Sequence, residues 1–194
     1  PYMKTSDELK TKPTQHSVQK LREIGIQPDI LLCRTEKILS KAIKEKIALF
    51  CSVEAKSVIN AMDVSSIYEV PLSLENEGIS KIILAKLGMK GKEPDLDRWQ
   101  KINLILKKPE GEVRIGIVGK YVDLKESYKS LTEALIHGGI GNNARVIFDW
   151  VEAEELEKEN GTKLLKECDG ILVPGGFGDR GVEGKIKAVQ FSRE

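Results

Sequence analysis

The apolar positions of residues 14–90 alternate between helical spacing and short continuous runs. A helix is predicted after Thr14, because Val18, Leu21 and Ile24 recur at helical spacing and Gly25 follows where a helix C-cap lies. Two apolar runs, at residues 30–33 and 57–59, have the length and composition of buried strands. Further helices are predicted at residues 40–50, 67–74 and 79–87. This order indicates an α/β fold with parallel strands.

Glycine and proline cluster at residues 88–112, around one short amphipathic helix. The pattern then restarts with a strand at residues 113–119, a helix ended by Gly138 and Gly139, and strands at 146–151 and 170–173. A last helix follows, bearing Val182, Ile186 and Val189. The order predicts the opening of a doubly wound parallel sheet. We therefore expect one domain at residues 1–90, a linker at 91–111 and a second domain at 112–194.

Composition and charge narrow the class of protein. The 194 residues include 31 Lys plus Arg against 30 Asp plus Glu, so the net charge of +1 argues against a nucleic-acid partner. No apolar run approaches the roughly 20 residues of a membrane span, and we expect no membrane partner. Three scattered Cys and two His give no zinc spacing, so no metal site is expected within this chain. A reduced, cytoplasmic protein is predicted.

The chain begins at Pro1 without an initiator Met, and it ends inside an amphipathic run. We therefore expect a segment of a longer polypeptide, whose remaining catalytic groups lie outside residues 1–194.

A basic segment is the first candidate for chemistry. Pro13 disfavours the helical region for Lys12, so an extended segment is expected to lead two lysines and two threonines into a helix N-terminus. Such a site suits an anion such as phosphate, although a solvated basic lead-in to a helix has the same sequence. Lys46 is expected at the edge of the apolar stripe that its helix forms with Ile43 and Phe50, where it either covers core surface or points its charge into a cleft.

A glycine-rich segment, Pro174-Gly175-Gly176-Phe177-Gly178, directly follows the predicted strand at 170–173. Ligands of open α/β sheets bind beyond the carboxyl ends of the strands. Glycines there allow backbone N–H groups to face a ligand, as an oxyanion hole requires. The alternative is a glycine-rich turn without a ligand.

These segments resemble the CTP synthase family. The resemblance is carried by KTKPTQHSV at residues 10–18, GIQPDIL at 25–31, KIALFC at 46–51, GIVGKY at 116–121, YKS at 128–130 and ILVPGGFG at 171–178. It continues through RGVEG at residues 180–184 and covers essentially the whole chain in order.

The resemblance implies an ATP-dependent ligase that aminates UTP to CTP, the last step of de novo pyrimidine nucleotide synthesis. Members phosphorylate the 4-oxygen of UTP and receive ammonia from a class I glutaminase. The first part of this chain would be the C-terminal part of a P-loop-type amidoligase (synthetase) domain. The last part would be the first part of a flavodoxin-like glutaminase domain. Mg²⁺, activation by GTP, feedback inhibition by CTP and a homotetramer are implied as well.

Residue roles are implied by the same resemblance. The UTP/CTP site would comprise Lys10, Thr11, Lys12, Pro13, Thr14, Gln15 and Lys46, and the ATP site Met62, Asp63 and Val64. Members often have Lys at the position of Met62. Glutamine would meet Gly175, Gly176 and Phe177, with Gly176 at the oxyanion, and Arg180 and Glu183 lie near the region tied to GTP. The family's nucleophilic Cys, its His and Glu partners and its Mg²⁺ ligands would lie outside this chain. Cys33, Cys51 and Cys168 are therefore expected to be small buried residues.

Two alternatives stay open: another class I glutamine amidotransferase, and a non-catalytic nucleotide-binding regulatory module. The presence of both the basic segment and the glycine-rich segment favours a CTP synthase over either alternative.

Overall fold

A computed structural model describes residues 2–3 and 8–194, with side chains described from residue 8 onward. The chain divides into two compact units, Pro1–Asn103 (unit 1) and Leu104–Glu194 (unit 2). Both contain parallel strands joined by helices, which confirms the α/β class. None of the helices found in the described part of the chain has the length and apolarity needed to cross a bilayer.

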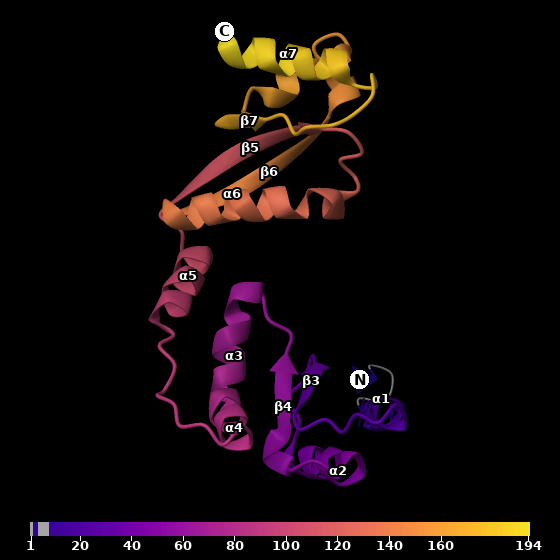
Figure 1. Ribbon diagram of the computed structural model, residues 1–194. Coiled ribbons are helices and arrows are strands. Elements are labelled where there is room, and N and C mark those ends of the chain that lie inside the picture. The colour runs from indigo at the N-terminus through magenta and orange to yellow at the C-terminus, as the bar shows by residue number, and fades with distance from the viewer. Residues whose placement is uncertain (1, 4–7) are drawn as a thin grey trace. The chain divides into compact units, whose positions relative to one another are not determined.

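Unit 1 is built around two parallel strands (Figure 1). Its elements are β1 (Tyr2–Met3), β2 (Glu8–Leu9), α1 (Lys12–Glu23), β3 (Leu31–Thr35), α2 (Lys41–Cys51), η1 (Ala55–Ser57), β4 (Val58–Met62), η2 (Ile67–Glu69), α3 (Val70–Asn76), α4 (Ile79–Lys86) and α5 (Asp97–Lys107), whose end passes into unit 2. β3 pairs with β4 in parallel, from Leu31 opposite Val58 to Thr35 opposite Met62. A core of Val18, Leu39, Ile47, Ala48, Cys51 and Val58 joins α1 and α2 to these strands.

The helix α1 differs at its start from the sequence prediction. It begins at Lys12, and Thr11 before it already has helical dihedral angles (φ −92°, ψ −20°), so the expected extended Lys12 is wrong. Pro13 fits because N–H groups of the first turn have no intrahelical partner to lose. The predicted glycine cap is confirmed. Gly25 has φ +86°, its N–H donates to the carbonyl of Arg22, and that of Ile26 donates to Leu21.

The apolar face of α2 is rotated from the predicted stripe. Ile47, Ala48 and Cys51 are buried, whereas Phe50 is 57% exposed, contrary to its expected place on the inner face. The residue after the helix, Ser52, is left-handed with φ +54°. Lys46 lies one position before the buried Ile47 and is exposed.

Unit 2 has a three-stranded parallel sheet in the order β6-β5-β7. Its elements are β5 (Gly111–Gly119), η3 (Lys125–Tyr128), α6 (Lys129–Gly141), β6 (Ala144–Glu152), η4 (Ala153–Glu157), η5 (Gly161–Leu165), β7 (Gly170–Leu172) and α7 (Val182–Arg193). The first strand is central, and the sheet lies between α6 on one side and α7 on the other (Figure 1). The core beneath α7 contains Val118, Val151, Ala153, Leu156, Leu165 and Ala188.

The sequence predicted that Gly138 and Gly139 end the helix, and this prediction is wrong. Instead α6 continues to Gly141. A Cβ on Gly139 would lie 2.6 Å from the carbonyl oxygen of Ala144 and 2.7 Å from Cγ2 of Val146. The missing side chain thus allows α6 to lie close against β6, and this close packing outweighs the low helix propensity of glycine.

The larger apolar side chains of α7 do not form its buried face. Val182, Ile186 and Val189 are 39%, 45% and 50% exposed, and the helix buries Gly184 and Ala188 instead. A Cβ on Gly184 would lie 1.7 Å from the carbonyl oxygen of Ala153. The close approach that only glycine permits therefore decides which face of α7 is buried.

Candidate functional site

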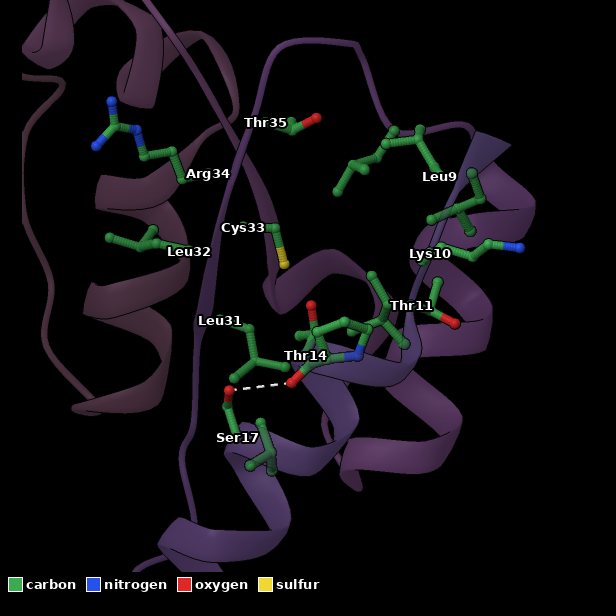
Figure 2. A pocket seen from close by; sticks show the side chains of 15 residues that line it. Leu9, Lys10, Thr11, Thr14, Ser17, Leu31, Leu32, Cys33, Arg34 and Thr35 are labelled. Carbon is green, nitrogen blue, oxygen red and sulfur yellow. Dashed lines mark hydrogen bonds between the residues drawn. The ribbon is translucent and has the colours of Figure 1, made fainter. Parts of the chain in front are cut away.

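The first pocket lies in unit 1, between β3 and the N-terminal end of α1, and has a volume of about 510 Å³ (Figure 2). Four residues of the predicted UTP/CTP site line it: Lys10, Thr11, Pro13 and Thr14. The side chains of Leu31 and Cys33 point from β3 toward α1, while those of Leu32 and Arg34 point to the other side of the strand (Figure 2). The pocket thus has an apolar base and a polar rim at the start of a helix.

Three residues of the predicted set, Lys12, Gln15 and Lys46, are absent from the residues that line this pocket. Gln15 acts indirectly, because its Nε2 donates to Oγ1 of the buried Thr11 at 3.1 Å. Ser17, which the sequence analysis did not select, donates from Oγ to the carbonyl oxygen of Pro13 at 3.0 Å (Figure 2). These bonds stabilise the first turn of α1.

An acidic residue beside the pocket was missed by the sequence analysis. Glu8 forms an ion pair with Lys10, and this hydrogen bond lowers the pKa of the Glu8 carboxyl. Lys46 lowers the same pKa through its charge, so the exposed Lys46 on α2 acts on the group that Lys10 binds. The pocket rim at Lys10 thus carries an acidic group beside its basic one. An anionic ligand there would have to compete with Glu8 for Lys10.

The second pocket of unit 1 has a volume of about 390 Å³ and contains all three residues of the predicted ATP segment, Met62, Asp63 and Val64. Arg34 is a further lining residue: its Nε donates to Oδ1 of Asp63 at 2.7 Å, and this bond raises the pKa of the guanidinium. The backbone N–H of Asp63 donates to the carbonyl of Thr35 at 3.1 Å. Arg34 and Asp63 lie close together because the parallel pairing of β3 and β4 places the ends of both strands at one sheet edge.

In the part of the chain that the structure describes, no three His, Cys, Asp or Glu side chains are grouped as a metal site would require. The described residues thus offer no ready-made cluster of three such ligands.

The glycine-rich loop of unit 2 follows β7 and lies at the carboxyl edge of the sheet, beside the end of the central strand β5. Its position is the switch point of a doubly wound sheet, because the connections from β5 and β6 run to opposite sides. Phe177 is fully exposed, and Gly178 has φ +76°. Two lysines missed by the sequence analysis bind the loop: Lys120, directly after β5, and Lys185 in α7.

Arg180 binds an acidic neighbour. Its Nε and Nη2 each lie 2.8 Å from a carboxylate oxygen of Glu154, and these hydrogen bonds raise the pKa of the guanidinium. The guanidinium carbon also lies 4.6 Å from the ring centroid of Tyr121, whose φ of +54° is rare for a non-glycine residue. Glu183 lies in the exposed first turn of α7. Arg180 thus contacts Tyr121, which follows β5, and Glu154, which follows β6.

The cysteines differ in burial. Cys51 is fully buried, whereas Cys33 and Cys168 are partly covered, so full burial is confirmed only for Cys51. Burial raises the pKa of all three thiols. At neutral pH the thiols are held in the protonated form, which is a poor nucleophile.

Two family models match the chain, one within unit 1 and one within unit 2. The family model for the CTP synthase N-terminus matches residues 1–89, and that for class-I glutamine amidotransferase matches residues 123–194. CTP synthase of Geotalea uraniireducens is 59% identical over 194 residues, and that of Methanocaldococcus jannaschii is 56% identical over 200 residues. Each alignment covers 100% of this chain. This chain belongs to the CTP synthase family.

The chain spans 36% of the length of the Geotalea CTP synthase and 37% of the Methanocaldococcus one. A solved glutaminase domain of Trypanosoma brucei CTPS, with bound acivicin, is 45% identical over 42% of this chain and 32% of that one. The TM-score between the two structures is 0.39.

Proposed function

We propose that the complete enzyme, a polypeptide of the length of the curated CTP synthases, converts UTP to CTP with ATP and with ammonia from glutamine. One observation carries this proposal. The same chain holds a basic pocket rim at residues 10–14 and a glycine-rich loop at the edge of a parallel sheet, and its whole length aligns with CTP synthases. Residues 1–90 are assigned to a P-loop-type amidoligase domain, 91–111 to a linker and 112–194 to a flavodoxin-like glutaminase domain.

The pocket at α1 is the proposed site for UTP and for CTP as feedback inhibitor. Lys10 at its rim supplies a positive charge, Lys12 begins the helix, and Thr11 and Thr14 supply hydroxyl groups. The positive end of α1 adds to the attraction for phosphate. Pro13 and Gln15 shape the first turn, and Lys46 contributes through its charge near Glu8. UTP and CTP share their phosphates, so these residues serve both nucleotides.

The pocket at β4 is the proposed ATP site. Asp63 and its partner Arg34 form the polar side, while the remaining lining is mostly apolar and suits a nucleobase: Leu32, Ala61, Met62, Val64, Ile67, Val70 and Leu74. When bound, Mg²⁺ would neutralise charge on the phosphates of ATP. Its protein ligands are assigned to residues outside this chain, as the resemblance to the family implies.

The loop after β7 is the proposed oxyanion and glutamine site, with Gly175, Gly176 and Phe177 in contact with the substrate. The sheet order supports this assignment, because β6-β5-β7 is the 2-1-3 opening of a flavodoxin-like sheet. The nucleophilic Cys and its His and Glu partners are assigned outside this chain. Arg180 and Glu183 are assigned to the region where GTP acts as activator. A homotetramer and a cytoplasmic location complete the proposal.

The experiment is an assay of CTP formation by the complete enzyme with UTP and ATP, given either glutamine or an ammonium salt. The proposal expects CTP from both nitrogen sources. Glutamine hydrolysis without CTP from either source would favour a different class I amidotransferase. Nucleotide binding without either reaction would favour a regulatory module.

A further inference from the structure

Three carbonyl oxygens of the loop at residues 174–178 accept hydrogen bonds from two lysines that lie far apart in the sequence. Nζ of Lys185 donates to the carbonyl oxygen of Pro174 at 2.9 Å. Nζ of Lys120 donates to the carbonyl oxygens of Phe177 and Gly178 at 2.9 and 3.0 Å. The two lysines therefore bind the loop on either side of Gly175 and Gly176.

The amide N–H groups of the same loop, unlike these carbonyl groups, have no hydrogen-bond partner among the described residues of unit 2. These are the N–H groups of Gly175, Gly176, Phe177 and Gly178. The carbonyl and the N–H of a trans peptide unit point in opposite directions. Holding the carbonyls of Pro174 and Phe177 on lysines thus turns the N–H groups of Gly175 and Gly178 away from those lysines. The loop keeps its donors available to a ligand.

The backbone position of Lys185 is set by the close packing of α7 against Ala153. Gly184, the preceding residue, lies against the backbone of Ala153 so closely that a Cβ would reach its carbonyl oxygen at 1.7 Å. Nζ of Lys185 then lies 3.3 Å from the point where a Cβ on Gly176 would be, so the ammonium group is beside Gly176 itself. The lysine is partly buried, which strengthens its hydrogen bond relative to one in open water.

We propose that Lys120 and Lys185 are positioning residues, forming a two-lysine clamp that presents the loop N–H groups to the oxyanion formed during glutamine hydrolysis. This inference rests on the proposed glutaminase function. Donors held in place before the reaction stabilise developing charge without reorganising. Without Lys185, the Pro174–Gly175 peptide is free to rotate. The loop must then become ordered during the reaction, which raises the activation free energy of glutamine hydrolysis.

A direct role in substrate binding has a different kinetic signature. If Lys185 bound the carboxylate of glutamine, its loss would mainly raise KM, because that contact is equal in the ground state and the transition state. A clamp that orients oxyanion donors mainly affects kcat for glutamine hydrolysis.

The test uses Lys185→Met, Lys185→Arg and Lys120→Met in the complete enzyme. Lys187→Met is the matched control, because Lys187 is on the same helix and donates to a carbonyl oxygen outside the loop, that of Glu157, at 2.8 Å. We expect Lys185→Met to lower kcat for glutamine hydrolysis by about tenfold or more. KM for glutamine should stay within about twofold, and ammonia-dependent CTP formation should be unchanged. Lys185→Arg should restore most of the kcat, and Lys187→Met should behave as wild type.

Wild-type kcat in Lys185→Met, or a rise in KM alone, would overturn the clamp. If Lys185→Met also loses ammonia-dependent activity through misfolding, Lys120→Met decides in the same way from the other element. A wild-type enzyme that makes CTP from ammonium but never from glutamine would instead overturn the glutaminase assignment on which the clamp rests.

Discussion

Glu77 and Lys44 form an ion pair between the end of α3 and α2, with 25% and 24% of their side chains exposed. The same carboxylate oxygen of Glu77 accepts a hydrogen bond from the backbone N–H of Asn60 in β4 at 3.0 Å. Asn60 is buried, and its Oδ1 accepts from the N–H of Leu39. The pair thus links α2, β4 and α3 within unit 1.

The first prediction concerns this pair. Burial alone would raise the pKa of Glu77, but the hydrogen bonds from Lys44 and the Asn60 N–H lower it on balance. A lowered folded-state pKa contributes stability above the unfolded value of about 4.3, and this contribution is lost as the pH falls through the folded value. Glu77→Gln should therefore destabilise the chain by about 1.5–3 kcal/mol at pH 7.

Urea unfolding of wild type and Glu77→Gln at pH 7 and pH 3 measures this effect. The difference between the two proteins should shrink at pH 3. An equal difference at both pH values would show that the ionised carboxylate is not the stabilising group.

The second prediction uses the adjacent glycines of α6. Gly139→Ala places a methyl group against Ala144 and Val146, and should destabilise unit 2 by about 1–3 kcal/mol. Gly138→Ala meets no atom within 4 Å and should stabilise the helix by about 0.5–1 kcal/mol. Thermal unfolding of the two variants should shift in opposite directions. A loss of stability in Gly138→Ala would mean that α6 ends near Gly138, as its sequence suggests.

Local sequence signals predicted most elements of the fold. The Gly25 cap and the strands β3, β4, β5 and β6 follow from turn chemistry and apolar runs that depend on few distant contacts. The buried faces of α2 and α7 do not follow from the spacing of their apolar residues, because long-range packing decides them. Gly184 lies against the carbonyl of Ala153, 31 residues earlier in the chain, and helical periodicity carries no trace of that contact.

The candidate sites were predicted in part for a similar reason. Motif strings selected residues 10–15 and 174–178, and the structure has a pocket beside the first segment and a sheet-edge loop at the second. Their partners come from other elements: Glu8 for Lys10, Arg34 for Asp63, and Lys185 for Pro174. A single charged residue on a surface helix or strand has no local signal that marks it. Only the paired strand ends of β3 and β4 gave a reason to look for Arg34.

The third prediction concerns the thiol of Cys168. Burial raises its pKa most, and the charge of Asp149 raises it further, whereas the charge of Arg114 lowers it. Asp149→Asn should therefore lower the pKa and speed alkylation of Cys168 at pH 8 by about two- to tenfold. Arg114→Gln should slow it. Residue-resolved mass spectrometry after iodoacetamide treatment measures both rates, and changes of the same sign would contradict the electrostatic account.

The fourth prediction tests the UTP/CTP pocket in the complete enzyme. Lys10→Ala should weaken UTP and CTP together, by about ten- to a hundredfold, because both present the same phosphates. Glu8→Gln should strengthen both, since it removes the carboxylate that competes for Lys10. Lys20→Ala is the control, because Lys20 is exposed and pairs with Glu23 at the far end of α1. Titrations that leave both affinities unchanged in Lys10→Ala would remove this pocket from the nucleotide site.

If the loop after β7 stabilises the oxyanion of glutamine hydrolysis, a change in this loop should spare CTP synthesis from ammonia. Gly176→Pro removes the N–H of residue 176 and fixes its φ. Gly176→Ala is the matched variant, because it keeps the N–H and adds only a methyl group 3.3 Å from the flexible end of Lys185.

The most direct measurement compares CTP formation from glutamine and from ammonium salt in these two variants of the complete enzyme. Gly176→Pro is expected to lower the glutamine-dependent rate by about 10²–10³ and to keep the ammonia-dependent rate. Gly176→Ala should retain much more of the glutamine-dependent rate. Full glutamine-dependent activity in Gly176→Pro would contradict the assignment of this loop.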